Sequence, residues 1–225
     1  PDQAPTLDDS EVSLFTRPAT EVGGDYYDFL LSEDATLTLA LGDATGHGME
    51  AGTIVACTKG LFQSLSPDMD VVDSLTHMSK QLRKMRIGRN GMALALIKLN
   101  GNSLSYSSAG IPPLLIYRSQ GNEVQEVLAE GLPLGLKTTG KYHAHDLELL
   151  PGDTILLMTD GLPERLNHDG HEFGYARTMS TFREIAHNGV DRICELLAAA
   201  GDEWANGCEQ EDDISFAVLK YRPKQ

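Results

Sequence analysis

The segment from Leu39 to Gly52 limits the possible folds of this chain more than any other part. Its sequence is LALGDATGHGMEAG, in which an apolar run leads into one acidic residue and then into a turn rich in glycine. Residues 36–41 alternate polar and apolar side chains as a half-buried strand does, which places Asp43 at or just past the strand's end. Glycines in the turn permit backbone angles that other residues avoid, and helical periodicity follows. The segment therefore predicts a strand, an acidic turn and a helix.

The same segment also has an ordinary structural interpretation. The sequence Asp-Ala-Thr-Gly is common turn chemistry, and an Asp before a helix is a frequent N-terminal cap. On this motif alone, a chemical and a structural role for Asp43 are equally open.

The length and the charge of the chain limit the classes of protein to which it can belong. The 225 residues suit one large domain with enough apolar content for a buried core. With 18 basic and 33 acidic residues the formal net charge is -15, which disfavours nucleic-acid binding and favours cation binding or a basic partner. No apolar run has transmembrane length, so no membrane association is predicted. The three cysteines are far apart and lack CxxC spacing, which indicates a reducing, cytoplasmic compartment.

The start of the chain has the composition of a linker. Residues 1–10 are polar and contain prolines, and the first residue is Pro rather than Met. We therefore predict a linker-like segment over 1–10 and one domain over 11–225, excised from a longer protein in which a sensor or receiver domain precedes it.

Periodicity and turn residues predict a chain in which strands outnumber helices. The middle of the chain is expected to be a strand-rich meander, with a hairpin turn at Asn100-Gly101-Asn102. The expected strands are residues 11–15, 26–31, 36–41, 92–99, 103–108, 114–117, 124–128, 142–149, 154–159 and 214–221. The expected helices are residues 51–65, 71–85, 176–186 and 190–204.

Basic residues gather at the end of the helix predicted over 71–85 and just after it. They are Lys80, Arg83, Lys84, Arg86 and Arg89. Cations at this end complement the negative end of the helix dipole, which is the simpler interpretation. A docking patch is the alternative.

Acidic residues recur at the ends of predicted strands. These positions are Asp25, Asp43, Asp160 and the pair Asp212 and Asp213. Asp160 ends an apolar run, where an uncompensated charge at the edge of a core is costly, so a metal or a hydrogen-bonding turn must compensate it. For Asp25 and its neighbour Asp28, a Gly-Gly-Asp turn with solvated acids is the simpler interpretation when they are taken alone.

The acids together suit a particular chemistry. Mg²⁺ and Mn²⁺ prefer oxygen ligands, and this set supplies them without His or Cys. Two such ions about 3.5 to 4 Å apart can hold a bridging water, lower its pKa and orient it in line with a phosphorus atom. The pattern therefore predicts hydrolysis of a phosphate ester by a metal-activated water.

Six motifs of the chain occur in the same order as in SpoIIE/RsbU-like phosphatases, which the chain resembles from about Arg17 to Tyr221. These are bacterial members of the metal-dependent, protein phosphatase 2C-like (PP2C-like) class of serine/threonine phosphatases. The motifs are VGGDYYD at Val22, GDATGHG at Gly42, SAGIPP at Ser108, LPLG at Leu132, MTDGL at Met158 and DDIS at Asp212.

The resemblance implies an α+β fold, a four-layer αββα sandwich of two mainly antiparallel β-sheets flanked by helices, with two Mn²⁺ or Mg²⁺ ions in a cleft at one edge. It also implies the metal ligands: Asp43 as the acid bridging both ions, the Ala44 backbone carbonyl beside it, Asp25 on the second metal, and Asp160 and Asp212 on the first, with Asp213 as the alternative to Asp212.

Two further residues are candidates. His47, beside the bridging acid, is a possible general acid for the leaving oxygen, although a loop histidine that caps the turn is the simpler interpretation. Arg17 is the nearest candidate for the substrate phosphate, with a salt bridge to nearby acids as the alternative.

By resemblance, the chain is expected to be a cytoplasmic bacterial phosphoserine/phosphothreonine protein phosphatase. The implied substrate is a phosphorylated STAS-type anti-anti-sigma protein in a partner-switching pathway that controls a sigma factor. A pseudophosphatase that binds a partner without turnover is the alternative, and the four filled acid positions favour the enzyme. A phosphodiesterase or nuclease is disfavoured by the net negative charge.

Because the helices predicted over 51–85 directly follow Asp43, an upstream domain or a homodimer partner is expected to regulate turnover through them.

Overall fold

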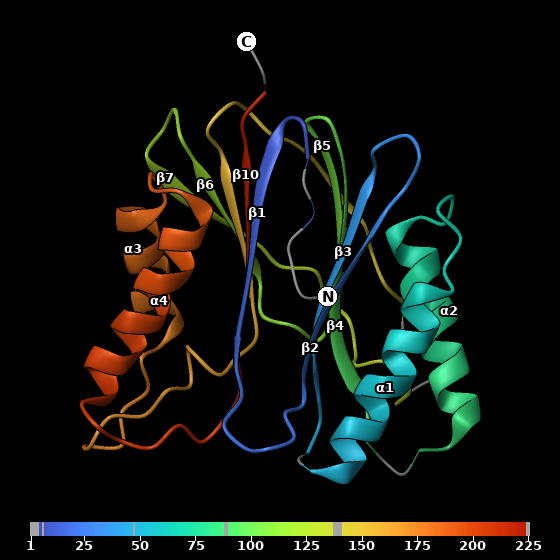
Figure 1. Ribbon diagram of the computed structural model, residues 1–225, viewed down its shortest axis with the longest axis horizontal. Helices are drawn as coiled ribbons and strands as arrows, with labels where there is room; N and C mark the ends of the chain where they lie inside the picture. Colours follow the sequence, from blue (N-terminus) through green and yellow to red (C-terminus); the bar gives the residue numbers. More distant parts are fainter. Residues whose placement is uncertain (1–4, 6, 47, 88–89, 137–140, 224–225) are drawn as a thin grey trace. The chain divides into compact units, whose positions relative to one another are not determined.

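The computed structural model describes residues 5, 7–46, 48–87, 90–136 and 141–223. These residues form ten strands and four helices. The chain divides into two compact units. The first unit contains Thr20–Ile111 and Leu128–Glu148, and the second contains the chain up to Ala19, Pro112–Val127 and everything from Leu149 onward. Each unit is one sheet with a pair of helices on it (Figure 1).

The first unit is a five-stranded antiparallel sheet in the order β2-β3-β4-β5-β8. Its strands are β2 (Asp25–Leu31), β3 (Leu37–Ala44), β4 (Met92–Asn100), β5 (Ser103–Ala109) and β8 (His145–Glu148). Helices α1 (Met49–Gln63) and α2 (Val71–Met85) pack on this sheet (Figure 1). The predicted hairpin joins β4 to β5, and Gly101 in its turn has a positive φ of 57°.

Helix α2 has the predicted bounds because its start and its apolar stripe are both encoded locally. The Asp70 side chain accepts a hydrogen bond of 2.8 Å from the Asp73 backbone N–H and caps the helix. The stripe facing the sheet consists of the buried residues Val71, Leu75, Met78 and Leu82. Val72, the next residue after Val71, is only partly buried.

A buried carboxylate attaches α1 to β2. Asp28 is 2% exposed and accepts hydrogen bonds from the Tyr26 hydroxyl (3.2 Å), Lys59 Nζ (3.1 Å) and Gln63 Nε2 (2.8 Å). Burial raises the pKa of Asp28, but the hydrogen bonds from Gln63, Lys59 and the Phe29 N–H outweigh it, and the pKa lies below its ordinary value. The interpretation of Asp28 as a solvated acid is therefore wrong: helix α1 covers it.

The second unit is a five-stranded antiparallel sheet in the order β1-β10-β9-β6-β7. Its strands are β1 (Ser10–Arg17), β6 (Leu114–Arg118), β7 (Glu123–Val127), β9 (Thr154–Met158) and β10 (Ile214–Tyr221). Helices α3 (Tyr175–Ile185) and α4 (Val190–Ala205) pack on this sheet (Figure 1). The middle of the chain is thus not one meander, because β6 and β7 belong to a different sheet from β4, β5 and β8.

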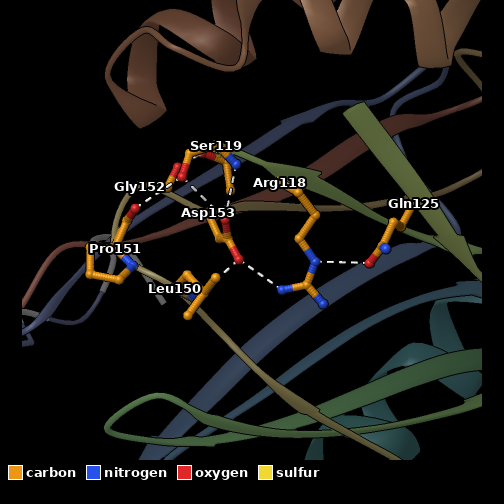
Figure 2. A network of polar contacts seen from close by, with 8 residues as sticks. Arg118, Ser119, Gln125, Leu150, Pro151, Gly152 and Asp153 are labelled. Carbon is orange, nitrogen blue, oxygen red and sulfur yellow. Dashed lines mark hydrogen bonds and ion pairs between the residues drawn. The ribbon is translucent and has the colours of Figure 1, made fainter. Parts of the chain in front are cut away.

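A second buried carboxylate fixes the start of β9. The side chain of Asp153, 0% exposed, accepts hydrogen bonds from Arg118 Nη1 (2.7 Å) and from the backbone N–H groups of Ser119 (3.0 Å) and Leu150 (3.0 Å), as Figure 2 shows. Arg118 Nε also donates to Gln125 on β7 at 2.8 Å. This network ties the turn before β9 to the hairpin of β6 and β7.

The predicted α+β class, with two mainly antiparallel sheets flanked by helices, is confirmed. The strand predicted over 36–41 forms as β3, but it is not half-buried, because α1 packs on the face that carries Thr38 and Ala40. None of the described helices is long and apolar enough to cross a membrane. The linker over 1–10 and the single domain over 11–225 stay predictions, although Ser10 already pairs with Tyr221 as the first residue of β1.

We expect Asp28→Asn to lower the free energy of unfolding by about 2 kcal/mol near pH 7, because the variant removes a buried charged acceptor. The pKa of Asp28 in the folded state lies below its unfolded-state value of about 4. The contribution of Asp28 to the free energy of unfolding is therefore present above about pH 4 and is lost as the pH falls through the folded-state pKa. The stability difference between the parent and the variant should shrink as the pH falls from about 6 to about 3. Urea unfolding of the parent and the variant at several pH values measures this difference in the free energy of unfolding.

The matched control is Asp68→Asn, in the exposed loop between α1 and α2. It should change stability by less than about 0.5 kcal/mol at any of these pH values. An Asp28→Asn variant as stable as this control would contradict the role given to Asp28.

Candidate functional site

The predicted strand, acidic turn and helix form as expected. Asp43 is the next-to-last residue of β3, which ends at Ala44. Gly46 and Gly48 have positive φ angles of 93° and 72°, so the turn needs both glycines. Gly48, not Asp43, is the N-cap of α1, and the capping interpretation of Asp43 is therefore wrong. His47, the candidate general acid, lies outside the described residues.

Two predicted ligands of the first unit lie directly opposite each other. Asp25 on β2 is the register partner of Asp43 on β3, and both are partly buried. A Cβ atom on Gly24 would come within 3.0 Å of Asp43 Oδ1 and of the Ala44 carbonyl oxygen, so glycine allows β2 to approach both groups. Like charges opposite each other destabilise a sheet, and a bound cation would remove this cost.

Hydrogen bonds to the start of β4 hold the turn that follows Asp43. The Thr45 N–H donates to the Gly91 carbonyl oxygen at 3.0 Å, and the Gly91 N–H donates to Thr45 Oγ1 at 2.8 Å. Met92 is the register partner of Ala44. The Ala44 carbonyl, a predicted ligand, thus belongs to a fixed backbone.

The other two predicted ligands lie at one end of the second unit's sheet. Asp160 comes two residues after β9, and Asp212 two residues before the antiparallel neighbour β10. Burial, and then the charge of Asp212, raise the pKa of Asp160. Burial, and then the charges of Asp160, Glu172 and Asp212, likewise raise the pKa of Glu164. Negative charge is therefore concentrated at this end of the sheet, and a divalent cation would relieve it.

Gly161 lets the turn that carries Asp160 pack against the segment that carries Asp212. A Cβ atom on Gly161 would lie 1.9 Å from the Asp213 carbonyl oxygen, so no larger residue fits without a backbone shift. The Thr159 N–H donates to the Ser215 carbonyl oxygen at 3.1 Å, and the Ser215 N–H donates to Thr159 Oγ1 at 3.1 Å. The distance between the two acidic segments is thus set by backbone packing.

Asp212 and Asp213 differ in their surroundings. Asp213 is 5% exposed, and its Oδ1 accepts a hydrogen bond of 2.7 Å from the Ala19 N–H. Asp212 is exposed, and its Oδ1 accepts a hydrogen bond of 2.8 Å from the Asp213 N–H. These surroundings favour Asp212 as the ligand and give Asp213 a role in holding the chain after β1. The choice between them stays a prediction.

Arg17 has protein partners in the second unit. Its Nη1 and Nη2 both donate to Asp202 at 2.8 Å, and its Nε donates to Gln210 at 2.6 Å. The alternative interpretation, in which Arg17 pairs with a nearby acid, thus has direct support. Its role at the substrate phosphate stays a prediction.

Arg165 contacts the segment before Asp212, although its sequence context does not mark it as a site residue. This side chain is 8% exposed and donates to the carbonyl oxygens of Cys208, at 2.7 Å, and Glu209. It connects the loop after Asp160 to the segment before Asp212. In the sequence Arg165 is one basic residue in a polar loop, and no spacing or motif marks its partners.

The candidate ligands are thus two pairs of carboxylates, one in each unit, together with one backbone carbonyl. Within the ranges that the structure covers, no three His, Cys, Asp or Glu side chains form a cluster arranged to hold a metal. Carboxylate and carbonyl oxygens are nevertheless the donors that Mg²⁺ and Mn²⁺ take, so the chemistry of this donor set fits such ions.

Comparison with known proteins identifies the family. The family model described as "Stage II sporulation protein E (SpoIIE)" matches residues 33–222. This match covers most of the chain, and the chain therefore belongs to the SpoIIE family.

Two curated relatives illustrate the similarity. Phosphoserine phosphatase RsbU of Bacillus subtilis is 27% identical over an alignment that covers 93% of this chain and 63% of RsbU. Protein IcfG of Synechocystis is 22% identical over 97% of this chain and 39% of its own length. The chain thus spans less than two thirds of either relative.

Solved structures show that the fold is PP2C-like. The SiaA-PP2C domain of Pseudomonas aeruginosa has a TM-score of 0.80 and 24% identity, over 93% of this chain and 84% of that domain. The RsbU and RsbW domains of Rv1364c from Mycobacterium tuberculosis give a TM-score of 0.83 and 24% identity, over 98% of this chain and 62% of that chain.

We expect Gly161→Ala to lower the free energy of unfolding by about 1 to 3 kcal/mol, because its Cβ would collide with the backbone at Asp213. Gly60→Ala is the matched control, since Gly60 lies in α1 and a Cβ there would meet no atom within 4 Å. This control should raise stability by up to about 1 kcal/mol through helix propensity. Denaturant unfolding of both variants tests the contact, and equal effects would contradict it.

Proposed function

We propose that the chain is a metal-dependent protein serine/threonine phosphatase that hydrolyses phosphoserine and phosphothreonine. The observation that carries the proposal is the pairing of acids at strand ends: Asp25 lies opposite Asp43, and Asp160 follows β9 while Asp212 precedes its antiparallel neighbour β10. These acids belong to a SpoIIE-family chain whose relative RsbU is a phosphoserine phosphatase by name.

The proposed metal ligands are Asp43, the Ala44 carbonyl, Asp25, Asp160 and Asp212, with Asp213 as the alternative to Asp212. Two divalent cations, Mn²⁺ or Mg²⁺, would lower the pKa of a water and place it in line with the substrate phosphorus. The protein's own part is to hold the two acids within each pair close together despite their repulsion. Gly24 and Gly161 allow the close approaches, and the bonds between Thr45 and Gly91 fix the carbonyl.

As substrate we propose a phosphorylated STAS-type anti-anti-sigma protein in a partner-switching pathway. Support comes from the similarity to RsbU and to a solved chain that contains both RsbU and RsbW domains. An upstream sensor or receiver domain, or a second copy of the chain, would act through α1 and α2, the two helices that follow Asp43. The free cysteines Cys57, Cys194 and Cys208 agree with the proposed cytoplasmic location.

The central test compares the parent chain with Asp43→Asn. The substrates are a serine-phosphorylated anti-anti-sigma protein and a simple aryl phosphate, each assayed with Mn²⁺, with Mg²⁺ and with a chelator. We expect metal-dependent turnover in the parent and a loss of about 100-fold or more in the variant, because the bridging ligand is weakened.

Asp68→Asn is again the control and should keep full activity. Turnover that a chelator leaves intact would overturn the metal mechanism. A folded parent chain that binds the phosphoprotein but hydrolyses neither substrate with either metal would favour the pseudophosphatase.

A second prediction concerns Arg165 as a positioning residue. Because it connects the two acidic segments of the second unit, Arg165→Met should weaken Mn²⁺ binding by about tenfold. Arg165→Lys should restore part of this affinity, since an ammonium can still donate to the Cys208 and Glu209 carbonyls. Isothermal titration calorimetry measures the Mn²⁺ affinity of the parent chain and of each variant.

The matched control for Arg165 is Arg118→Met, because Arg118 is also a partly buried arginine of the second unit but acts at the opposite end of β9 (Figure 2). It should lower the free energy of unfolding and leave Mn²⁺ affinity unchanged. Equal Mn²⁺ affinities for Arg165→Met and Arg118→Met would show that Arg165 has a structural role only.

A further inference from the structure

The first unit contains a cavity of about 170 Å³ beside the end of α2. Ile54, Leu82, Met92 and Leu134 contribute apolar walls, and the exposed Arg83 and Arg86 also line it. The Met92 N–H donates to the Leu134 carbonyl oxygen at 3.1 Å, and the Leu134 N–H donates to the Met92 carbonyl oxygen at 2.7 Å, so these two lining residues are held together. The cavity is too small for a typical free ligand, whose sites occupy about 300 to 1,000 Å³, and suits a single inserted side chain.

The cations at this cavity have no partner among the described residues. Arg83, Arg86 and the neighbouring Lys80 make no side-chain hydrogen bond or ion pair within that part of the chain, whereas other arginines, such as Arg17 and Arg118, pair with acids. The chain carries 33 acidic and 18 basic residues, so acidic partners are plentiful. The helix dipole explains cations in the last turn of α2, but it does not explain an apolar cavity beside them.

The cavity adjoins the turn that follows Asp43. Gly91 and Met92 line the cavity, and they are the residues that pair with Thr45 and Ala44. Glu50, the second residue of α1, accepts a hydrogen bond of 2.9 Å from Asn90, another lining residue. A segment bound in the cavity would therefore lie next to the proposed catalytic turn.

We propose that this cavity docks an acidic segment of the phosphorylated protein substrate. One apolar side chain of the segment enters the cavity, and carboxylates beside it pair with Arg83 and Arg86. The inference rests on the proposed function, because it takes the occupant to be the protein that carries the phosphoserine. The carboxylates of such a segment complement Arg83 and Arg86, which have no acidic partner among the described residues.

The test is the double variant Arg83→Glu/Arg86→Glu, assayed with Mn²⁺ on the serine-phosphorylated anti-anti-sigma protein and on an aryl phosphate. We expect the KM for the phosphoprotein to rise by about tenfold with kcat little changed, and the parameters for the aryl phosphate to stay within about twofold. The parent's KM for the phosphoprotein should also rise with salt, and the variant's should not. Both arginines are exposed, and circular dichroism verifies the fold.

The matched control is Lys141→Glu/Arg183→Glu, which makes the same charge change at two exposed cations away from the cavity. An equal rise in KM for the control would show a general charge effect and overturn the inference. An unchanged KM for the cavity variant would overturn it while the proposed function stands.

Two other outcomes would also overturn the docking inference. If light scattering shows that the cavity variant turns a dimer into a monomer, the occupant is a second copy of the chain. If the parent hydrolyses neither substrate, the proposed function is wrong and the docking inference falls with it. The milder variant Arg83→Gln/Arg86→Gln replaces the first if charge reversal prevents folding.

Discussion

Close backbone packing at two glycines holds carboxylates near one another despite their repulsion. Gly24 brings β2 against Asp43 and the Ala44 carbonyl, and Gly161 brings the turn with Asp160 against the segment that carries Asp212. Burial, and then the charge of Asp212, raise the pKa of Asp160, so the second of these pairs is held together at a cost in stability. The fold therefore concentrates negative charge at these positions, although this lowers stability. Such an arrangement favours a role in binding cations.

Other acids of the same chain have the opposite character. Asp28 and Asp153 are more deeply buried, yet Lys59 and Arg118 pair with them and further donors satisfy their oxygens. These acids anchor α1 to β2 and the hairpin of β6 and β7 to β9. Burial alone therefore does not mark a functional acid in this fold. The candidate ligands are distinguished by a second carboxylate: Asp25 lies opposite Asp43, and the charge of Asp212 contributes to the raised pKa of Asp160.

Family membership and local geometry support the proposed function independently. The SpoIIE family match covers residues 33–222, and the PP2C-like fold follows from solved relatives with TM-scores of 0.80 and 0.83. Neither observation depends on the register of Asp25 with Asp43 or on the unpaired arginines of α2. The cavity beside those arginines, the proposed docking site for the substrate, belongs to the same unit as the proposed bridging acid.

The sequence by itself determined the features that depend on neighbouring residues. The bounds of α2 and β10, the hairpin after β4 and the positive φ angles of Gly46 and Gly48 follow from local periodicity, capping and turn chemistry. Tertiary structure alone decided which sheet each middle strand joins, that Asp28 is covered by α1, and that Arg165 reaches the carbonyls before Asp212. These features depend on contacts between residues far apart in the chain, and a local pattern carries no information about such partners.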